Sequence, residues 1–166
     1  SGSESIEKGD ITEIDGVAYK SAYDVPWDII GCYSRVFVRE SISGLKDEIV
    51  YIRDLSEKTA VTLADFESRE GNIISVWKEN GAKLRRIKLS SDCQYIYNGR
   101  KISSNIDYYI RKGAGNLLFA DNDDDGAYDV VYINSYSYIT VLSYDSVTET
   151  VRDKTDADFT VCIDEI

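Results

Sequence analysis

Alternation of apolar and polar positions dominates this chain, and no long stretch shows apolar residues at helical spacing. In the run 83–89, for example, Arg86 and Lys88 alternate with Ile87 and Leu89, so one face of the run is expected to be solvent-exposed and the other buried. Thirteen tyrosines and many isoleucines and valines favour strands, because aromatic and β-branched side chains pack well on a pleated surface. The pattern therefore predicts a mostly-β fold.

Three turn dipeptides divide the strand-like runs into hairpins: Asp15-Gly16, Asn80-Gly81 and Asn98-Gly99. Each supplies two residues that tolerate positive φ, which a tight hairpin turn requires. Each also lies between two runs of strand character, so the paired strands are expected to be antiparallel.

Helix is expected in only two short segments. One is 25–30, with Pro26 near its start, and the other is 105–112, which Gly113 can end. Together with the turns, this predicts antiparallel hairpins that form one or two small β-barrels or sandwiches in tandem, with one or two short helices.

A weak internal repeat suggests two related halves. Shifting the chain by 81 positions places 49–52 on 130–133 and 36–38 on 117–119. The alternative is that any two hairpins in a chain rich in Val, Ile and Tyr align this well. If the repeat is a duplication, the boundary is expected near 90–93.

The predicted organisation is a linker over residues 1–10, a first β unit over 11–90 and a second over 91–166. The opening Ser1-Gly2-Ser3 is typical of a linker or cloning remnant, and the chain contains no methionine. We therefore expect a piece of a longer or processed protein.

Charge and missing residue types narrow the chemistry. The net charge of −11 repels phosphate backbones and anionic lipids, so no nucleic-acid partner is expected and a cation is the better candidate. No run approaches the ~18 apolar residues of a membrane-spanning helix, so no membrane insertion is expected.

Without histidine, the chain cannot form a Ser-His-Asp, Cys-His or His-ligated zinc site. The cysteines are odd in number and widely spaced. Cys32, Cys93 and Cys162 are therefore predicted to be small buried apolar groups, with their redox state left open.

The segment 121–130 is the most informative for chemistry. Its acidic residues Asp121, Asp123, Asp125 and Asp129 stand at positions 1, 3, 5 and 9, and a glycine at position 6 permits a sharp bend. Alternate carboxylates can converge on a hard cation such as Ca²⁺, and the carbonyl of Ala127 can join them. These five residues are the candidate calcium ligands.

This loop resembles the strand–loop–strand calcium sites of integrin-type propeller repeats, whose pattern is D-x-D-x-D-G-x-x-D followed by an apolar residue. It is not an EF-hand, because Tyr132 stands where the bidentate Glu is needed and the flanking runs look like strands. The resemblance implies a metal loop but not a propeller, since there is no array of such loops. Asp124, at an even position, should point into water. The alternative is a solvated turn, because Asp and Gly are ordinary turn residues.

More broadly, the chain resembles β-rich modules of Gram-positive bacterial cell-surface proteins, often S-layer-related or stalk-bearing. The resemblance rests on the order of an opening hairpin, a strand at 35–39, Tyr97-Asn98-Gly99, and the stretch 115–136 with its Asp loop. It implies an extracellular, non-catalytic structural or adhesive module. Its expected partners are other domains of the parent protein or a cell-wall or host glycan. The three cysteines depart from such modules and leave the compartment open.

Two other functions remain as alternatives. Surface Tyr and Trp side chains could bind a carbohydrate or peptide, although such side chains more often fill a core. Strand alternation places Tyr136 and Tyr138 on one face, so these two are the candidate pair. An acid-pair hydrolase needs only two carboxylates at a suitable separation, and thirty acidic residues supply many accidental pairs. We therefore expect no enzyme.

Overall fold

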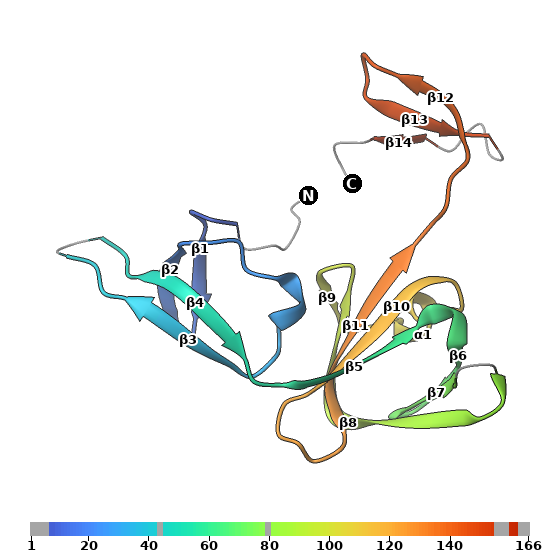
Figure 1. Cartoon of the computed structure of the whole chain (residues 1–166), viewed down its shortest axis with the longest axis horizontal. Coiled ribbons are helices and arrows are strands. Elements are labelled where there is room, and N and C mark those ends of the chain that lie inside the picture. The colour runs from blue at the N-terminus through green and yellow to red at the C-terminus, as the bar shows by residue number, and fades with distance from the viewer. Residues whose placement is uncertain (1–6, 43–44, 79–80, 155–159, 163–166) are drawn as a thin grey trace. The chain divides into compact units, whose positions relative to one another are not determined.

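The computed structural model describes residues 7–42, 45–78, 81–154 and 160–162, and most of them lie in strands (Figure 1). The predicted mostly-β class is confirmed. Contacts divide the chain into two units, Ser1–Ser135 and Tyr136–Ile166, which are described separately below.

The first unit begins with a four-stranded sheet in the order β1-β2-β4-β3. The Asp15-Gly16 turn joins the first two strands with φ values of 51° and 80°, so this predicted hairpin is confirmed. Pairs β1–β2 and β3–β4 are antiparallel, whereas β2 and β4 run parallel. The strands are β1 (Ile11–Ile14), β2 (Val17–Ser21), β3 (Ser34–Arg39) and β4 (Glu48–Asp54).

A larger sheet in the order β5-β10-β11-β8-β7-β6 completes the first unit and curls into a half-barrel (Figure 1). The long strand β8 pairs with β7 along its first half and with β9 and β11 along its second. The strands are β5 (Glu57–Thr62), β6 (Phe66–Glu70), β7 (Ile73–Trp77), β8 (Leu84–Tyr97), β9 (Arg100–Ile102), β10 (Ala114–Asp121) and β11 (Tyr128–Tyr136).

Strand β11 is buried on both faces, and it runs parallel to β8. Val131 and Ile133 enter the main core of the half-barrel, while Val130 and Tyr132 enter a smaller core on the other face. Because both faces are covered, this strand has a continuous apolar run instead of an alternating one. The main core also contains Leu63, Ile74, Val76, Ile87, Leu89, Tyr95, Ile110, Leu117 and Phe119.

The two helical predictions correspond to single turns. The 3₁₀ turn η1 (Trp27–Ile29) follows Pro26, and α1 (Ile106–Tyr109) follows Asn105. A third turn, η2 (Leu63–Asp65), joins β5 to β6, and the Thr62 hydroxyl caps it by accepting a hydrogen bond from Ala64 N at 3.0 Å. The Asn98-Gly99 hairpin is also confirmed, since it joins antiparallel β8 and β9. Of the third predicted turn, Asn80 lies outside the described residues, but β7 and β8 pair antiparallel on either side.

The second unit is a three-stranded antiparallel sheet in the order β12-β13-β14. Its strands are β12 (Val141–Asp145), β13 (Thr150–Asp153) and β14 (Thr160–Cys162).

The contact division at 135/136 does not coincide with the predicted division at 90/91, because β8 continues through that point without a break. Within the predicted linker, the described residues begin at Glu7, and Gly9 N donates a hydrogen bond to Ser21 O at 2.9 Å. The two predicted repeat copies fold as the hairpins β3–β4 and β10–β11, which belong to different sheets. The duplication itself stays a prediction.

Gly115 is the glycine at which a side chain should be most harmful. Its φ is +123°, and a Cβ would collide with the backbone carbonyl of Asn134 on β11. Gly115→Ala should lower the free energy of unfolding by about 3 kcal/mol or more, measured by denaturant titration. Gly99→Ala is the matched control, because its φ is also positive but no atom lies within 4 Å, so a loss of about 1–2 kcal/mol is expected. Equal losses in the two variants would contradict this prediction.

Candidate metal site

The Asp loop connects β10, which ends at Asp121, to β11, which begins at Tyr128, so it has the predicted strand–loop–strand setting. Asp121 is only 6% exposed, and its carboxylate organises the loop from inside. Oδ1 accepts hydrogen bonds from the backbone N–H groups of Asp123 (3.3 Å) and Asp124 (2.8 Å), and Oδ2 accepts one from Gly126 (3.0 Å). Positive φ values of 61° at Asp124 and 81° at Gly126 allow the backbone to wrap around this carboxylate.

Three predicted ligands converge in this loop. Asp121, Asp123 and Asp129 each offer one carboxylate oxygen, and these oxygens all lie within 4.8 Å of one another. Calcium binds oxygen at about 2.3–2.6 Å, so one ion can contact two oxygens that are this far apart. Asp129 is held in place because its Oδ2 accepts a hydrogen bond from Asn122 N at 2.8 Å. These three residues, here called the Asp triad, could hold a metal ion.

The other two candidate ligands are placed differently. Asp125 Oδ1 accepts a hydrogen bond from Ala127 N at 2.7 Å, and among the described residues Asp125 is not grouped with the triad. Ala127 is buried. A role for Asp125 and Ala127 as further ligands stays a prediction. Asp124 is exposed, as a side chain pointing into water would be.

Negative charge is concentrated beside the triad. Partial desolvation and the neighbouring carboxylates of Asp125 and Asp129 raise the pKa of Asp123. The anionic form of the Asp123 carboxyl is therefore disfavoured until a positive charge offsets the repulsion.

An open cleft of about 990 Å³ lies next to the loop. Among the described residues that line it, five are acidic and only Lys88 is basic. The cleft therefore favours cations. Its acidic residues are Glu70, Asp92, Asp123, Asp125 and Asp129.

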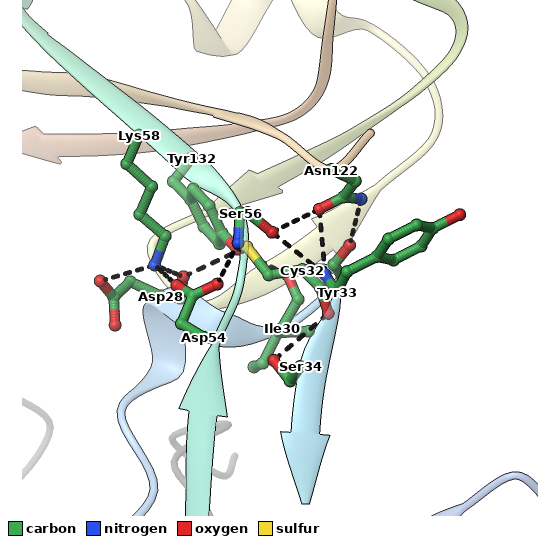
Figure 2. Close-up of polar contacts among 11 residues, drawn as sticks. Asp28, Ile30, Cys32, Tyr33, Ser34, Asp54, Ser56, Lys58, Asn122 and Tyr132 are labelled. Atoms are coloured by element: carbon green, nitrogen blue, oxygen red, sulfur yellow. Dashed lines mark hydrogen bonds and ion pairs between the residues drawn. The ribbon is translucent and has the colours of Figure 1, made fainter. Parts of the chain in front are cut away.

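Asn122, the second residue of the loop segment, ties the Asp loop to the first sheet (Figure 2). Its Oδ1 accepts hydrogen bonds from Tyr33 N at 3.0 Å and Ser56 Oγ at 2.6 Å, and its Nδ2 donates to Gly31 O at 3.0 Å. The loop is thus anchored to the chain just before β3 and between β4 and β5.

Lys58 forms a second group of contacts beside Asn122 (Figure 2). Its Nζ lies 2.5 Å from Asp54 Oδ2 and 3.2 Å from Asp28 Oδ2. It also lies 5.9 Å from the ring centre of Tyr132, whose hydroxyl donates to Ile30 O at 2.8 Å. Burial is the largest single influence and opposes the charged form, but the hydrogen bonds and charges of its neighbours, led by Asp54 and including Asp28, together outweigh burial, so the pKa of Lys58 is raised and the ammonium group persists.

Cys32 and Cys93 are free thiols and half-buried. Burial raises the pKa of Cys32, whose Sγ lies 3.0 Å from Tyr132 Oη, and raises the pKa of Cys93 to about 12. Both therefore stay protonated near neutral pH and lack the thiolate that nucleophilic chemistry needs. Cys162 lies in β14, and its side chain is outside the described residues.

The alternative ligand-binding pair is exposed. Tyr136 and Tyr138 are 60% and 89% exposed. Their use in binding a carbohydrate or peptide stays a prediction.

Comparison with known proteins identifies no relative. No protein-family model, no curated protein and no solved structure matches the chain. Among the described residues, no helix has the length and apolar character needed to cross a membrane.

Sequence reasoning missed Asn122 and Lys58. The side-chain partners of Asn122 are 66 to 91 residues away along the chain, so only the fold brings them together. The position of Asn122 directly after the first aspartate of the loop was the one local signal.

The anchoring role of Asn122 can be tested by Asn122→Ala. Removing the side chain leaves Tyr33 N, Ser56 Oγ and Gly31 O without this partner, so the free energy of unfolding should fall by about 1–2 kcal/mol in a denaturant titration. Asn72→Ala, an exposed asparagine that lines the same cleft, should change it by less than about 0.5 kcal/mol. A neutral effect of Asn122→Ala would refute the anchoring role.

Desolvation of Asp123 and repulsion from its neighbouring carboxylates predict a pH-dependent gain in stability for Asp123→Asn in the presence of a chelator. Because the folded protein raises the pKa of Asp123 above 3.8, protonated Asp123 favours folding. That contribution is complete below pH 3.8 and is lost as the pH rises through the folded-state pKa. The variant should therefore melt at a higher temperature than the wild type at pH 7, and this difference should vanish in acid. A difference that is independent of pH would show that charge is not its cause.

Proposed function

We propose that this chain is a non-catalytic structural β module, and that its Asp loop binds Ca²⁺ and is stabilised by it. The observation that carries the proposal is the convergence of three carboxylate oxygens, all within 4.8 Å of one another, from one short loop. Hard oxygen ligands are those that Ca²⁺ prefers. Mg²⁺ fits less well, because it demands a near-ideal octahedron at shorter distances.

The composition of the loop supports a weak site. Asp123 is exposed, Asp129 is half-buried, and the cleft beside them is open, so solvent would complete the coordination. Sites of this kind bind Ca²⁺ with dissociation constants of about 10⁻⁴–10⁻³ M, which suits an extracellular module. We therefore place the module in an extracellular bacterial surface protein. Protonated, partly buried thiols at Cys32 and Cys93 are compatible with that oxidising environment, because the thiolate is the reactive form.

The role of the ion would be structural, because it would stabilise the conformation of the Asp loop. An ion on the Asp triad would offset the repulsion around Asp123 and fix the loop from which Asn122 reaches the first sheet. Partners of such a module would be other domains of the parent protein or a glycan of the cell wall or host.

Calcium should raise the melting temperature of metal-free protein. If the dissociation constant is about 10⁻⁴ M, about 10 mM Ca²⁺ stabilises the fold by about 2.7 kcal/mol, or about 5–10 °C for a chain of this size, and Mg²⁺ by less. Asp129→Asn and Asp123→Asn should remove most of the calcium response. Asp124→Asn, which makes the same charge change in the same loop on an exposed side chain, should retain it.

Differential scanning fluorimetry with calcium and with chelator provides the measurement. Identical melting under both conditions would defeat the proposal. An equal loss of the calcium response in the Asp124 and Asp129 variants would show that calcium only screens the loop charge nonspecifically, and would contradict binding at the Asp triad.

A further inference from the structure

The solvent-facing side of the β3–β4 hairpin carries an unusual set of side chains, here called the aromatic–arginine face. Register places Arg35 opposite Arg53 and Phe37 opposite Tyr51, and Leu55 N donates to Tyr33 O at 2.9 Å in the next row. All six residues of this face are exposed: Tyr33, Arg35, Phe37, Tyr51, Arg53 and Leu55.

The aromatic side chains of this face are not core residues. Phe37 and Tyr51 are 44% and 54% exposed, although their ring centres lie only 5.7 Å apart. The intervening Val36 and Ile52 are half-buried and, with Trp27 of η1, line a groove of about 320 Å³. The packed side of the hairpin is therefore the one that carries Val36 and Ile52, and the opposite, aromatic–arginine face presents flat apolar surface to solvent. The Tyr33 ring likewise points away from the contacts that its backbone makes (Figure 2).

The arginine pair is the second observation. Like charges directly opposite each other on a sheet are destabilising. Among the residues that the structure describes, neither Arg35 nor Arg53 forms an ion pair, although the chain has 30 acidic and 19 basic residues. Two arginines at paired strand positions, neither of them in an ion pair within the described part of the chain, are well suited to bind an anion, because each guanidinium offers a planar fork of donors.

We propose that the aromatic–arginine face binds an anionic saccharide. The rows along the hairpin are about 7 Å apart and alternate between apolar, cationic and apolar. A saccharide chain presents the complementary pattern, with flat apolar ring faces to stack on Phe37, Tyr51 and Tyr33 and with carboxylate or sulfate groups to meet the arginines. A nucleic acid would offer stacking and phosphates too, but it carries a phosphate on every nucleotide and this face has a single cationic row, whereas a saccharide can carry its charge on only some of its rings. The face does not use the Asp triad, so the proposal stands apart from calcium binding.

The first experiment tests charge and sugar separately by calorimetric titration of the full chain at low salt. The carboxylate probe is an oligogalacturonate, with its methyl ester as the uncharged control, and dextran sulfate against dextran tests the sulfate source. Chelator is present throughout, because calcium could bridge uronates to the Asp loop. A charged probe should bind at least about tenfold tighter than its neutral control, and rising salt should weaken it.

Variants then locate the site. Arg35→Gln with Arg53→Gln should weaken binding at least about tenfold, whereas Arg86→Gln with Arg100→Gln, an equal charge change on exposed arginines of β8 and β9, should change it less than about twofold. Phe37→Ser with Tyr51→Ser should also weaken binding, and circular dichroism should show that every variant keeps its strand content.

Four outcomes would overturn the proposal. They are binding of the neutral controls as tightly as the charged probes, no binding of either charged probe, equal losses in the two arginine double variants, and tighter binding of single-stranded DNA than of the saccharides. Concentration-dependent dimers in sedimentation that Phe37→Ser abolishes would assign the face to a second copy of the chain instead.

Discussion

The double burial of β11 is the constraint on which the first unit depends. Val131 and Ile133 pack into the half-barrel, and Val130 and Tyr132 pack against Trp27, Ile30 and Cys32 on the other face. One strand therefore joins the curled sheet to the segment that leads into the first sheet. The Tyr132 hydroxyl is satisfied there by donating to Ile30 O, so burying it does not leave an unpaired polar group.

The same strand fixes the Asp loop. Asp129 is its second residue, and Asp121 is the last residue of β10 beside it, so the sheet holds two carboxylates of the triad at a set distance before any ion arrives. Backbone donors then hold Asp121 in place, and Asn122 adds an anchor to the first sheet. The loop is thus largely preorganised, while Asp123 supplies the exposed carboxylate.

The sequence predicted features that depend on neighbouring residues. Asp15-Gly16 and Asn98-Gly99 mark real hairpins because the positive φ of their residues is a local property. The spacing of Asp121, Asp123 and Asp129 likewise predicted their convergence. Among the described residues Asp125 is not grouped with these three, and spacing alone does not reveal this difference.

Features set by distant parts of the chain were not predictable in this way. The parallel pairing of β8 with β11 joins Tyr95 to Val131, and it was missed because alternation and turn signals predict only antiparallel neighbours. The unbroken run 130–133 was the available clue, since continuous apolar strands are typical of parallel pairing with both faces covered. The placement of Lys58 between Asp28 and Asp54 depends in the same way on the final topology.

The connection through η2 has a consequence for self-association. Strands β5 and β6 form the two edges of the larger sheet, yet Thr62 and Phe66 are separated by only the three residues Leu63–Asp65. Four backbone steps span at most about 14 Å, so these ends of the two edges stay close to each other and the sheet cannot flatten. Unpaired strand edges are the usual templates for runaway intermolecular β-pairing. Here the connection through η2 holds the adjoining ends of β5 and β6 near each other, which leaves little room for a neighbouring molecule to add a strand at that end.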